Sequence, residues 1–278
     1  MAINDFISTV WSETLHKELD KEYIAVRNCN RDFEGSIRRA GDTVNICGIE
    51  DIHVFSYTKN SDISALQTLD STKTQLRIDQ VEGFNFQIDD VDRAQQNPKL
   101  MQHAMSRAAS ALANSADRYV YGLYTGISAA NTVSKASAAY TDMLDLLLKV
   151  RTKLLANNVG SNTETVLEVS PEVAALLLKA KILTTESQEV MEKGLLGTFI
   201  GFKVYVSNNI CTAEGENKAV YHKCLARTKR AVAFAEQVNS VEAYRPEHRF
   251  ADAVKGLHLY GAKIVYPKEI VLLDLNLA

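Results

Sequence analysis

The chain has 278 residues, of which 46% are hydrophobic and 23% are charged. These values are typical of a folded globular protein with a sizeable core, and they exclude a disordered or fibrous chain. The 31 Lys and Arg residues nearly balance the 34 Asp and Glu residues, and the net charge of -3 argues against general affinity for free nucleic acid.

The N-terminal segment predicts an amphipathic helix. Apolar side chains recur at helical spacing at Ile3, Phe6, Ile7, Val10, Trp11, Leu15 and Leu19. The polar side lacks the excess of Lys and Arg that anionic lipids would select, so we expect the helix to dock on protein. Trp11 is the only tryptophan, and we expect it to be buried against another segment of this chain or of a neighbouring copy.

Nothing in the sequence predicts export or a membrane span. Asp5 stands where a secretory signal would carry Lys or Arg. The longest run without a charged residue, Tyr119–Ser134, is shorter than a membrane span and contains several polar residues. We therefore expect the protein to be made and kept in the cytoplasm, with no membrane partner.

Residues 42–90 predict a long two-stranded excursion with a loose tip. Alternating apolar side chains indicate strands at Thr43–Gly48, Thr74–Ile78 and Phe84–Ile88, and a polar stretch without periodicity separates the first two. Residues 50–92 carry nine acidic and three basic side chains, a net charge of -6. Because an isolated two-stranded ribbon is marginal in water, we expect it to be supported by another molecule.

A long basic helix is predicted next. Asn97 is a suitable N-cap, and Pro98 fits the first helical position. One apolar stripe runs through Met101, Met105, Ala108, Leu112, Ala116, Tyr119 and Leu123, and Gly122 and Gly126 mark the end of the helix. Residues 93–118 carry four basic side chains and one acidic, a net charge of +3.

The remaining sequence alternates helices with strands, and together with the preceding segments it predicts an α+β fold. Thr141 is expected to cap a helix that ends at residues 157–160, and Ser170 with Pro171 to begin another. Strands are predicted at residues 165–170, 199–207, 219–223, 231–235, 240–244, 251–265 and 269–275.

The sequence contains no GxSxG, HExxH or phosphate-loop motif, and its histidines are dispersed. Gly194, Gly197 and Gly201 follow a predicted helix and precede a strand, which is the reverse of a phosphate-binding loop. Two metal sites stay open as alternatives: the carboxylates Asp89, Asp90 and Asp92, and the soft ligands Cys211, His222 and Cys224. We expect no enzyme activity and no catalytic, cofactor-binding or metal-binding residue; a metal-dependent enzyme that uses the three aspartates is the alternative.

Several stretches, in order, resemble the major capsid proteins of tailed bacteriophages, which share the Hong Kong 97-like fold. The excursion resembles the E-loop of that fold, FNFQIDDVDRAQ (84–95) the strand that returns from it, and ALANSADRYVYGLYT (111–125) the spine helix. GLLGTFIGFKVYVSNNI (194–210) resembles a segment of the axial domain. RFADAVKGLHLYGAKIVYP (249–267) resembles the long late strand, whose ladder we expect Gly256 and Gly261 to interrupt.

The resemblance implies an N-terminal arm, an extended β-hairpin E-loop, a long spine helix with a peripheral β-sheet, and a mixed α/β axial domain. The implied boundaries are 1–41 for the arm with its amphipathic helix, 42–90 for the E-loop, 91–140 for the peripheral domain with the spine helix, 141–230 for the axial domain, 231–258 for strands returning to the peripheral domain, and 259–278 for strands returning to the axial domain.

The resemblance implies a structural protein that self-assembles, as pentamers and hexamers, into the icosahedral head shell enclosing the double-stranded DNA of a tailed phage. A bacterial compartment shell of the encapsulin type has the same fold and is the alternative. The implied partners are a portal, a decoration protein and packaged DNA without sequence-specific binding. Because only some forty residues precede the excursion, a separate scaffolding protein is implied as well. The implied location is the virion, and the host cytoplasm during assembly.

Charge suggests where copies of the chain meet. Arg107 and Arg118 are eleven residues apart, about 20° around a helix, so they share one face away from the apolar stripe. We expect this face to receive the acidic excursion of an adjacent subunit, with Asp62 and Asp70 near its tip. With Trp11, these four residues are the candidate inter-subunit contacts.

Overall fold

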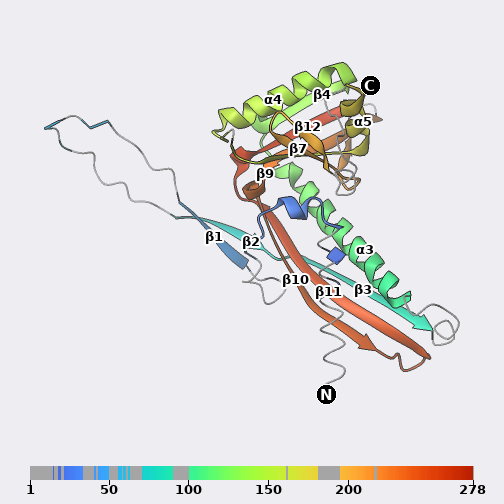
Figure 1. The fold of residues 1–278 in the computed structure, drawn as a ribbon. Coiled ribbons are helices and arrows are strands. Elements are labelled where there is room, and N and C mark those ends of the chain that lie inside the picture. Colours follow the sequence, from blue (N-terminus) through green and yellow to red (C-terminus); the bar gives the residue numbers. More distant parts are fainter. Residues whose placement is uncertain are drawn as a thin grey trace.

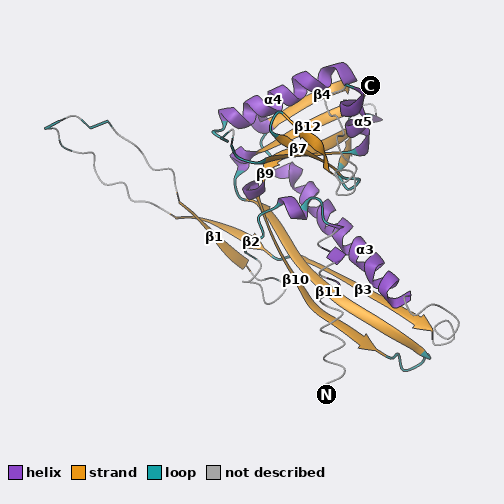
Figure 2. Cartoon of the chain, in the orientation of Figure 1, coloured by secondary structure: helices purple, strands orange, loops and turns teal. Residues whose placement is uncertain are grey.

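The computed structural model describes residues 15, 18–19, 22–33, 41, 43–49, 56–57, 59–60, 62, 71–89, 100–160, 162–180, 195–215 and 218–277. In these ranges one β-sheet runs alongside a long helix, a second sheet lies beyond one end of that helix, and a two-stranded ribbon points away from both sheets (Figures 1 and 2). None of the described helices is long and apolar enough to cross a membrane.

The first sheet is antiparallel and has the order β10-β11-β3. Its strands are β3 (Gln80–Asp89), β10 (Val232–Tyr244) and β11 (Ala251–Ile264), and α3 (Leu100–Gly122) runs along it (Figure 1). The apolar stripe predicted for the helix supplies Met105, Leu112 and Ala116 to a buried cluster that also contains Phe234 and Tyr260 of the sheet. Helix and sheet therefore bury their apolar faces against each other.

The opposite face of this sheet carries the ribbon. The strands β1 (Thr43–Ile49) and β2 (Ser71–Arg77) pair antiparallel, with Val44 opposite Leu76. Val44, Ile46, Leu76 and Ile78 pack on the sheet residues Ala233, Ala235 and Leu259 in a separate buried cluster. Because successive side chains of a strand point to opposite faces, Phe234 faces α3 while its two neighbours support the ribbon.

The second sheet is mixed, with the order β4-β12-β9-β5-β7-β6, and β8 pairs with β9 outside that path. Its strands are β4 (Thr132–Ala138), β5 (Thr165–Val169), β6 (Leu195–Phe199), β7 (Phe202–Val206), β8 (Thr212–Glu214), β9 (Val220–Thr228) and β12 (Ile270–Leu277). The helices α4 (Met143–Ala156) and α5 (Pro171–Lys179) cover it. Short 3-10 helices lie at Val26–Asn28, Leu123–Gly126, Ala129–Asn131, Tyr140–Asp142, Lys229–Ala231 and Pro267–Glu269.

Several predicted helix ends are confirmed and one is wrong. The Ser170 hydroxyl accepts a hydrogen bond from the Val173 amide at 3.4 Å, and Pro171 begins α5 as predicted. The N-cap of α4 is Asp142 and not Thr141, and its side chain makes no cap hydrogen bond to α4; the Asp142 carboxylate instead accepts from the Ala139 amide at 3.1 Å, at the start of the preceding 3-10 helix. The predicted caps of the spine helix, Asn97 and Pro98, lie outside the described residues.

Two strand predictions also change. The segment 199–207 forms part of a hairpin, because Ile200 (φ 47°) and Gly201 (φ 78°) turn the chain between β6 and β7. The segments 231–235 and 240–244 join into the single strand β10, with a register shift between Val238 and Ser240.

The expectation that Gly256 and Gly261 interrupt the late strand is wrong. Gly256 pairs with both Val241 and Phe84, and Gly261 pairs with Ala235, so β11 continues through both. A Cβ at Gly256 would lie 2.4 Å from the Phe84 ring, and one at Gly261 would lie 2.2 Å from the Arg77 carbonyl oxygen. Glycine therefore permits close packing at these two positions.

Candidate assembly surfaces

The N-terminal segment 22–33 is attached to the body through a buried carboxylate of the spine helix. Asp117 accepts hydrogen bonds from the backbone amides of Ile24 at 3.0 Å and Val26 at 3.1 Å. Burial raises the pKa of Asp117 to about 6, against the opposing effect of these hydrogen bonds. Asp117 is thus the side chain through which α3 holds the segment.

A buried ion pair holds the same segment from the second sheet. Arg227 of β9 binds both carboxylate oxygens of Glu168 of β5, at 2.9 Å each. Its guanidinium also donates to the carbonyl oxygens of Asn28 at 2.7 Å and Ala25 at 2.9 Å. The pair therefore fixes the path of the segment between the two sheets.

A third anchor lies on the first sheet. Glu236 of β10 accepts hydrogen bonds from the Tyr23 hydroxyl and from Arg31, the latter at 2.6 Å, and its other partner is His258 Nε2 at 2.9 Å. Burial by itself would raise the pKa of Glu236, but the hydrogen bond with His258 and the contacts with Tyr23 and Arg31 hold it below its usual value. Glu236 is therefore ionised and ties the arm segment to β10.

Sequence patterns do not by themselves indicate these anchors. Asp117 is the single acidic residue of the basic segment 93–118, and Glu168 is one residue of a predicted strand. A lone carboxylate in a fully buried strand such as Thr165–Val169 needs a buried cation, and that rule could have indicated Glu168 in advance. Nothing in the sequence indicates that its partner is Arg227, 59 residues away.

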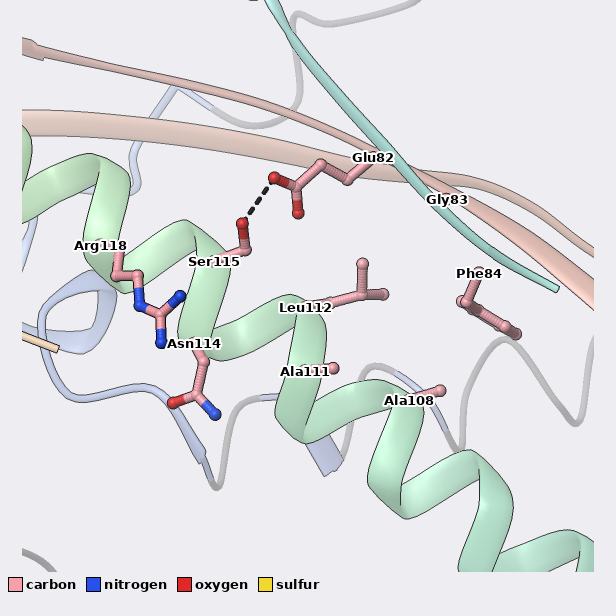
Figure 3. A pocket seen from close by; sticks show the side chains of 9 residues that line it. All are labelled: Glu82, Gly83, Phe84, Ala108, Ala111, Leu112, Asn114, Ser115 and Arg118. Carbon is pink, nitrogen blue, oxygen red and sulfur yellow. Dashed lines mark hydrogen bonds between the residues drawn. The ribbon is translucent and has the colours of Figure 1, made fainter. Parts of the chain in front are cut away.

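An open groove of about 550 Å³ lies between α3 and β3 (Figure 3). It is lined by Glu82, Gly83, Phe84, Ala108, Ala111, Leu112, Asn114, Ser115 and Arg118. Glu82 Oε1 accepts hydrogen bonds from the Ser115 hydroxyl at 2.5 Å and the Tyr260 hydroxyl at 3.0 Å. The groove therefore combines an apolar floor with a fixed carboxylate on one side and Arg118 on the other.

The structure gives positions for three of the five candidate contact residues. Arg107 and Arg118 are exposed on α3, and Arg118 also borders the groove. Asp62 is exposed in the excursion. Trp11 and Asp70 lie outside the described residues.

The two metal alternatives gain no support from geometry. Among the residues that the structure describes, no three His, Cys, Asp or Glu side chains are grouped as a metal ion would require. Burial raises the pKa of the Cys224 thiol to about 12, which disfavours the thiolate that a metal needs. Asp90 and Asp92 lie outside the described residues.

The chain matches one family profile and many solved structures. The family is described as phage capsid protein, and residues 71–273 match it. A structure from Mycobacterium phage Che8 is 25% identical, with 90% of each chain covered and a TM-score of 0.68. The capsid of Ralstonia phage GP4 is 11% identical, with 94% of this chain and 91% of that chain covered and a TM-score of 0.71.

A virus-like particle from Pyrococcus furiosus has the same fold at 13% identity, with 98% of this chain and 100% of that chain covered and a TM-score of 0.56. No curated protein sequence matches the chain.

Proposed function

This chain belongs to the phage capsid protein family, and from that premise we propose how its surfaces build a shell. It is a major capsid protein with the Hong Kong 97-like fold, and its place is the shell of the virion. We propose that pentamers and hexamers of the chain form an icosahedral head around double-stranded DNA.

The β1–β2 ribbon is the observation that carries this proposal. Its base is fixed to the first sheet through Val44, Ile46, Leu76 and Ile78. Beyond that base, residues 56–57, 59–60 and 62 are exposed, and Tyr57 has 64% of its surface exposed. The described residues of the excursion beyond the base thus offer exposed surface to a neighbouring copy, and heterologous contacts of that kind close into rings.

We propose that the neighbour's contact for this acidic excursion is the basic face of α3. Exposure of both Arg107 and Arg118 supports this, as does the exposed Asp62 on the excursion. Asp70 and Trp11 complete the proposed inter-subunit contacts. An exposed ion pair contributes only about 0–1 kcal/mol, but every subunit of the shell repeats it.

The remaining proposals concern the division of the chain and its partners. We divide it into arm, E-loop, peripheral domain and axial domain, with the three-stranded sheet and α3 as the support for the peripheral domain. We propose a separate scaffolding protein, a portal, a decoration protein, assembly in the host cytoplasm, and packaged DNA held without sequence-specific contacts. The modest net charge of -3 supports the last of these.

Co-expression with a scaffolding protein tests the assembly. Sedimentation and electron microscopy should find particles of megadalton mass, or pentamers and hexamers that become particles when the scaffold is added. A stable monomer at high concentration with scaffold present contradicts the proposal. Neighbouring portal and terminase genes support a phage head, whereas a neighbouring cargo-enzyme gene supports the encapsulin alternative.

A further inference from the structure

The tip of the β10–β11 hairpin presents an aromatic side chain to solvent. Phe250 is 84% exposed, more than any other large hydrophobic side chain in the part of the chain that the structure describes. The strands behind it are tied by the Lys255–Glu242 ion pair at 2.9 Å and by the hydrogen bond from the Tyr244 hydroxyl to Asn85 at 3.1 Å. Phe250 therefore projects into solvent from a hairpin whose strands are held in place by these interactions.

The α3–β3 groove is a hollow of suitable size and chemistry for such a side chain. Its floor consists of Phe84, Ala108, Ala111 and Leu112, and the two alanines leave the space open (Figure 3). A volume of about 550 Å³ is within the range of pockets that bind small molecules, so one aromatic ring with its flanking residues fits.

The hairpin cannot reach the groove of its own subunit. Within β11, Gly256 lies opposite Phe84 of the groove, whereas Asp252 lies opposite Ile88 near the far end of β3. Phe250 is six residues before Gly256, which places it about 20 Å along the strand direction from the groove. The chain forms a shell of identical copies, so a neighbour's groove is the available acceptor, in a heterologous contact.

Charge at both partners agrees with this occupant. Arg249 is exposed beside Phe250. At the groove, Oε1 of Glu82 accepts hydrogen bonds from Ser115 and Tyr260, and the carboxylate is turned toward Ser115 (Figure 3).

We propose that Phe250 of one subunit inserts into the α3–β3 groove of an adjacent subunit, with Arg249 beside Glu82. This contact rests on the proposed assembly and involves the hairpin tip, not the excursion; Arg118 borders the groove and also belongs to the basic face that is proposed to receive the excursion. The hairpin tip of one subunit and the spine helix of its neighbour then form one contact that is repeated between subunits of the shell.

A disulfide formed in assembled particles tests the contact. Phe250→Cys combined with Ala111→Cys, in a background with Cys211→Ser, should give a ladder of covalent oligomers after mild oxidation, because a disulfide requires Cα atoms within about 7 Å. The control pairs Phe250→Cys with Leu155→Cys, an exposed position on α4, and should give no ladder. Particles of the first variant that yield only monomers overturn the inference and leave the assembly proposal intact.

A measurement on the unmodified chain covers the case in which the variant fails to assemble. Hydroxyl-radical oxidation of Phe250 should be several-fold slower in wild-type particles than in dissociated subunits. Equal oxidation in the two states overturns the inference. If the wild-type chain forms no particle even with scaffold, the assembly proposal fails, and this contact fails with it.

Discussion

Arg227 and Glu168, on adjacent strands β9 and β5, form a two-point ion pair at 2.9 Å with neither side chain exposed. The spare donors of Arg227 bind backbone carbonyls of the N-terminal segment. The pair therefore links the core of the second sheet to the N-terminal segment.

Removal of Arg227 should strongly destabilise the subunit. Arg227→Met leaves a buried carboxylate and two carbonyl oxygens without their cation, and we expect a loss of about 3–5 kcal/mol in the free energy of unfolding. Arg230→Met is the matched control, since Arg230 pairs with Glu269 but is 59% exposed, and it should cost about 0–1 kcal/mol. Urea unfolding of dissociated subunits measures both, and equal losses would contradict the assigned role.

Asp117 gives the stability of the subunit a specific pH dependence. Its pKa is raised to about 6, so the folded state holds the proton more tightly than the unfolded chain, and stability falls as pH rises from about 4 through 6. Asp117→Asn removes this titration and leaves one acceptor for two amide groups. The stability of the wild type relative to the variant should therefore be roughly 2 kcal/mol higher at pH 4 than at pH 7.

The free energies of unfolding of the wild type and the variant at pH 4 and pH 7 test the direction of this pH dependence. The other titrating groups contribute equally to both proteins and cancel in the difference. A difference that is the same at pH 4 and pH 7 would show that Asp117 does not titrate in this window. Faster hydrogen exchange at the Ile24 and Val26 amides of the variant should accompany the loss.

Gly261 should tolerate no side chain. A Cβ there would lie 2.2 Å from the Arg77 carbonyl oxygen, so Gly261→Ala must displace backbone at the base of the ribbon. We expect a loss of about 1–3 kcal/mol, as for overpacked cores. Gly122→Ala, where a Cβ would meet nothing within 4 Å at the end of α3, should be neutral or stabilising. Thermal unfolding of both variants gives the comparison.

Reversal of the basic face should weaken particles. Arg107→Glu with Arg118→Glu places like charges opposite the proposed acidic excursion, and Asp62→Lys with Asp70→Lys in the same chain should partly restore assembly. High salt should reduce the effect, because the Debye length is about 3 Å at 1 M. Sedimentation of particles at low and high salt provides the test. Normal assembly by the double-Glu variant, with an unchanged salt response, would eliminate this contact.

Trp11 should contribute to assembly or to particle stability. A fully buried aromatic typically costs about 3–5 kcal/mol when truncated, so Trp11→Ala should give fewer particles or particles that dissociate at lower temperature. Trp11 is the only tryptophan, so fluorescence reports its surroundings directly. Solvent-like emission from intact particles would contradict burial.

The sequence by itself determined the local elements, because their signals are local. Apolar spacing predicts the spine helix that ends at Gly122 and the long strand Ala251–Ile264, and Ser170 with Pro171 predicts the start of α5. The turn between β6 and β7 could not be predicted in this way, because it requires left-handed backbone at Ile200 and Gly201, and these two residues lie inside an apolar run. Those residues adopt that conformation because β6 and β7 pair across them.

Only the tertiary structure decided which distant groups meet. Arg227 meets Glu168 because β9 and β5 are neighbours in the sheet, and Asp117 meets residues 24–26 because the N-terminal segment crosses α3. Burial then makes these charges important, since an unpaired charge in the interior is costly whereas the same charge on a surface is not. Periodicity along the chain carries no information on such pairings. The sequence therefore indicated the helices and strands of the shell protein, whereas the tertiary structure decided which side chains hold its N-terminal segment.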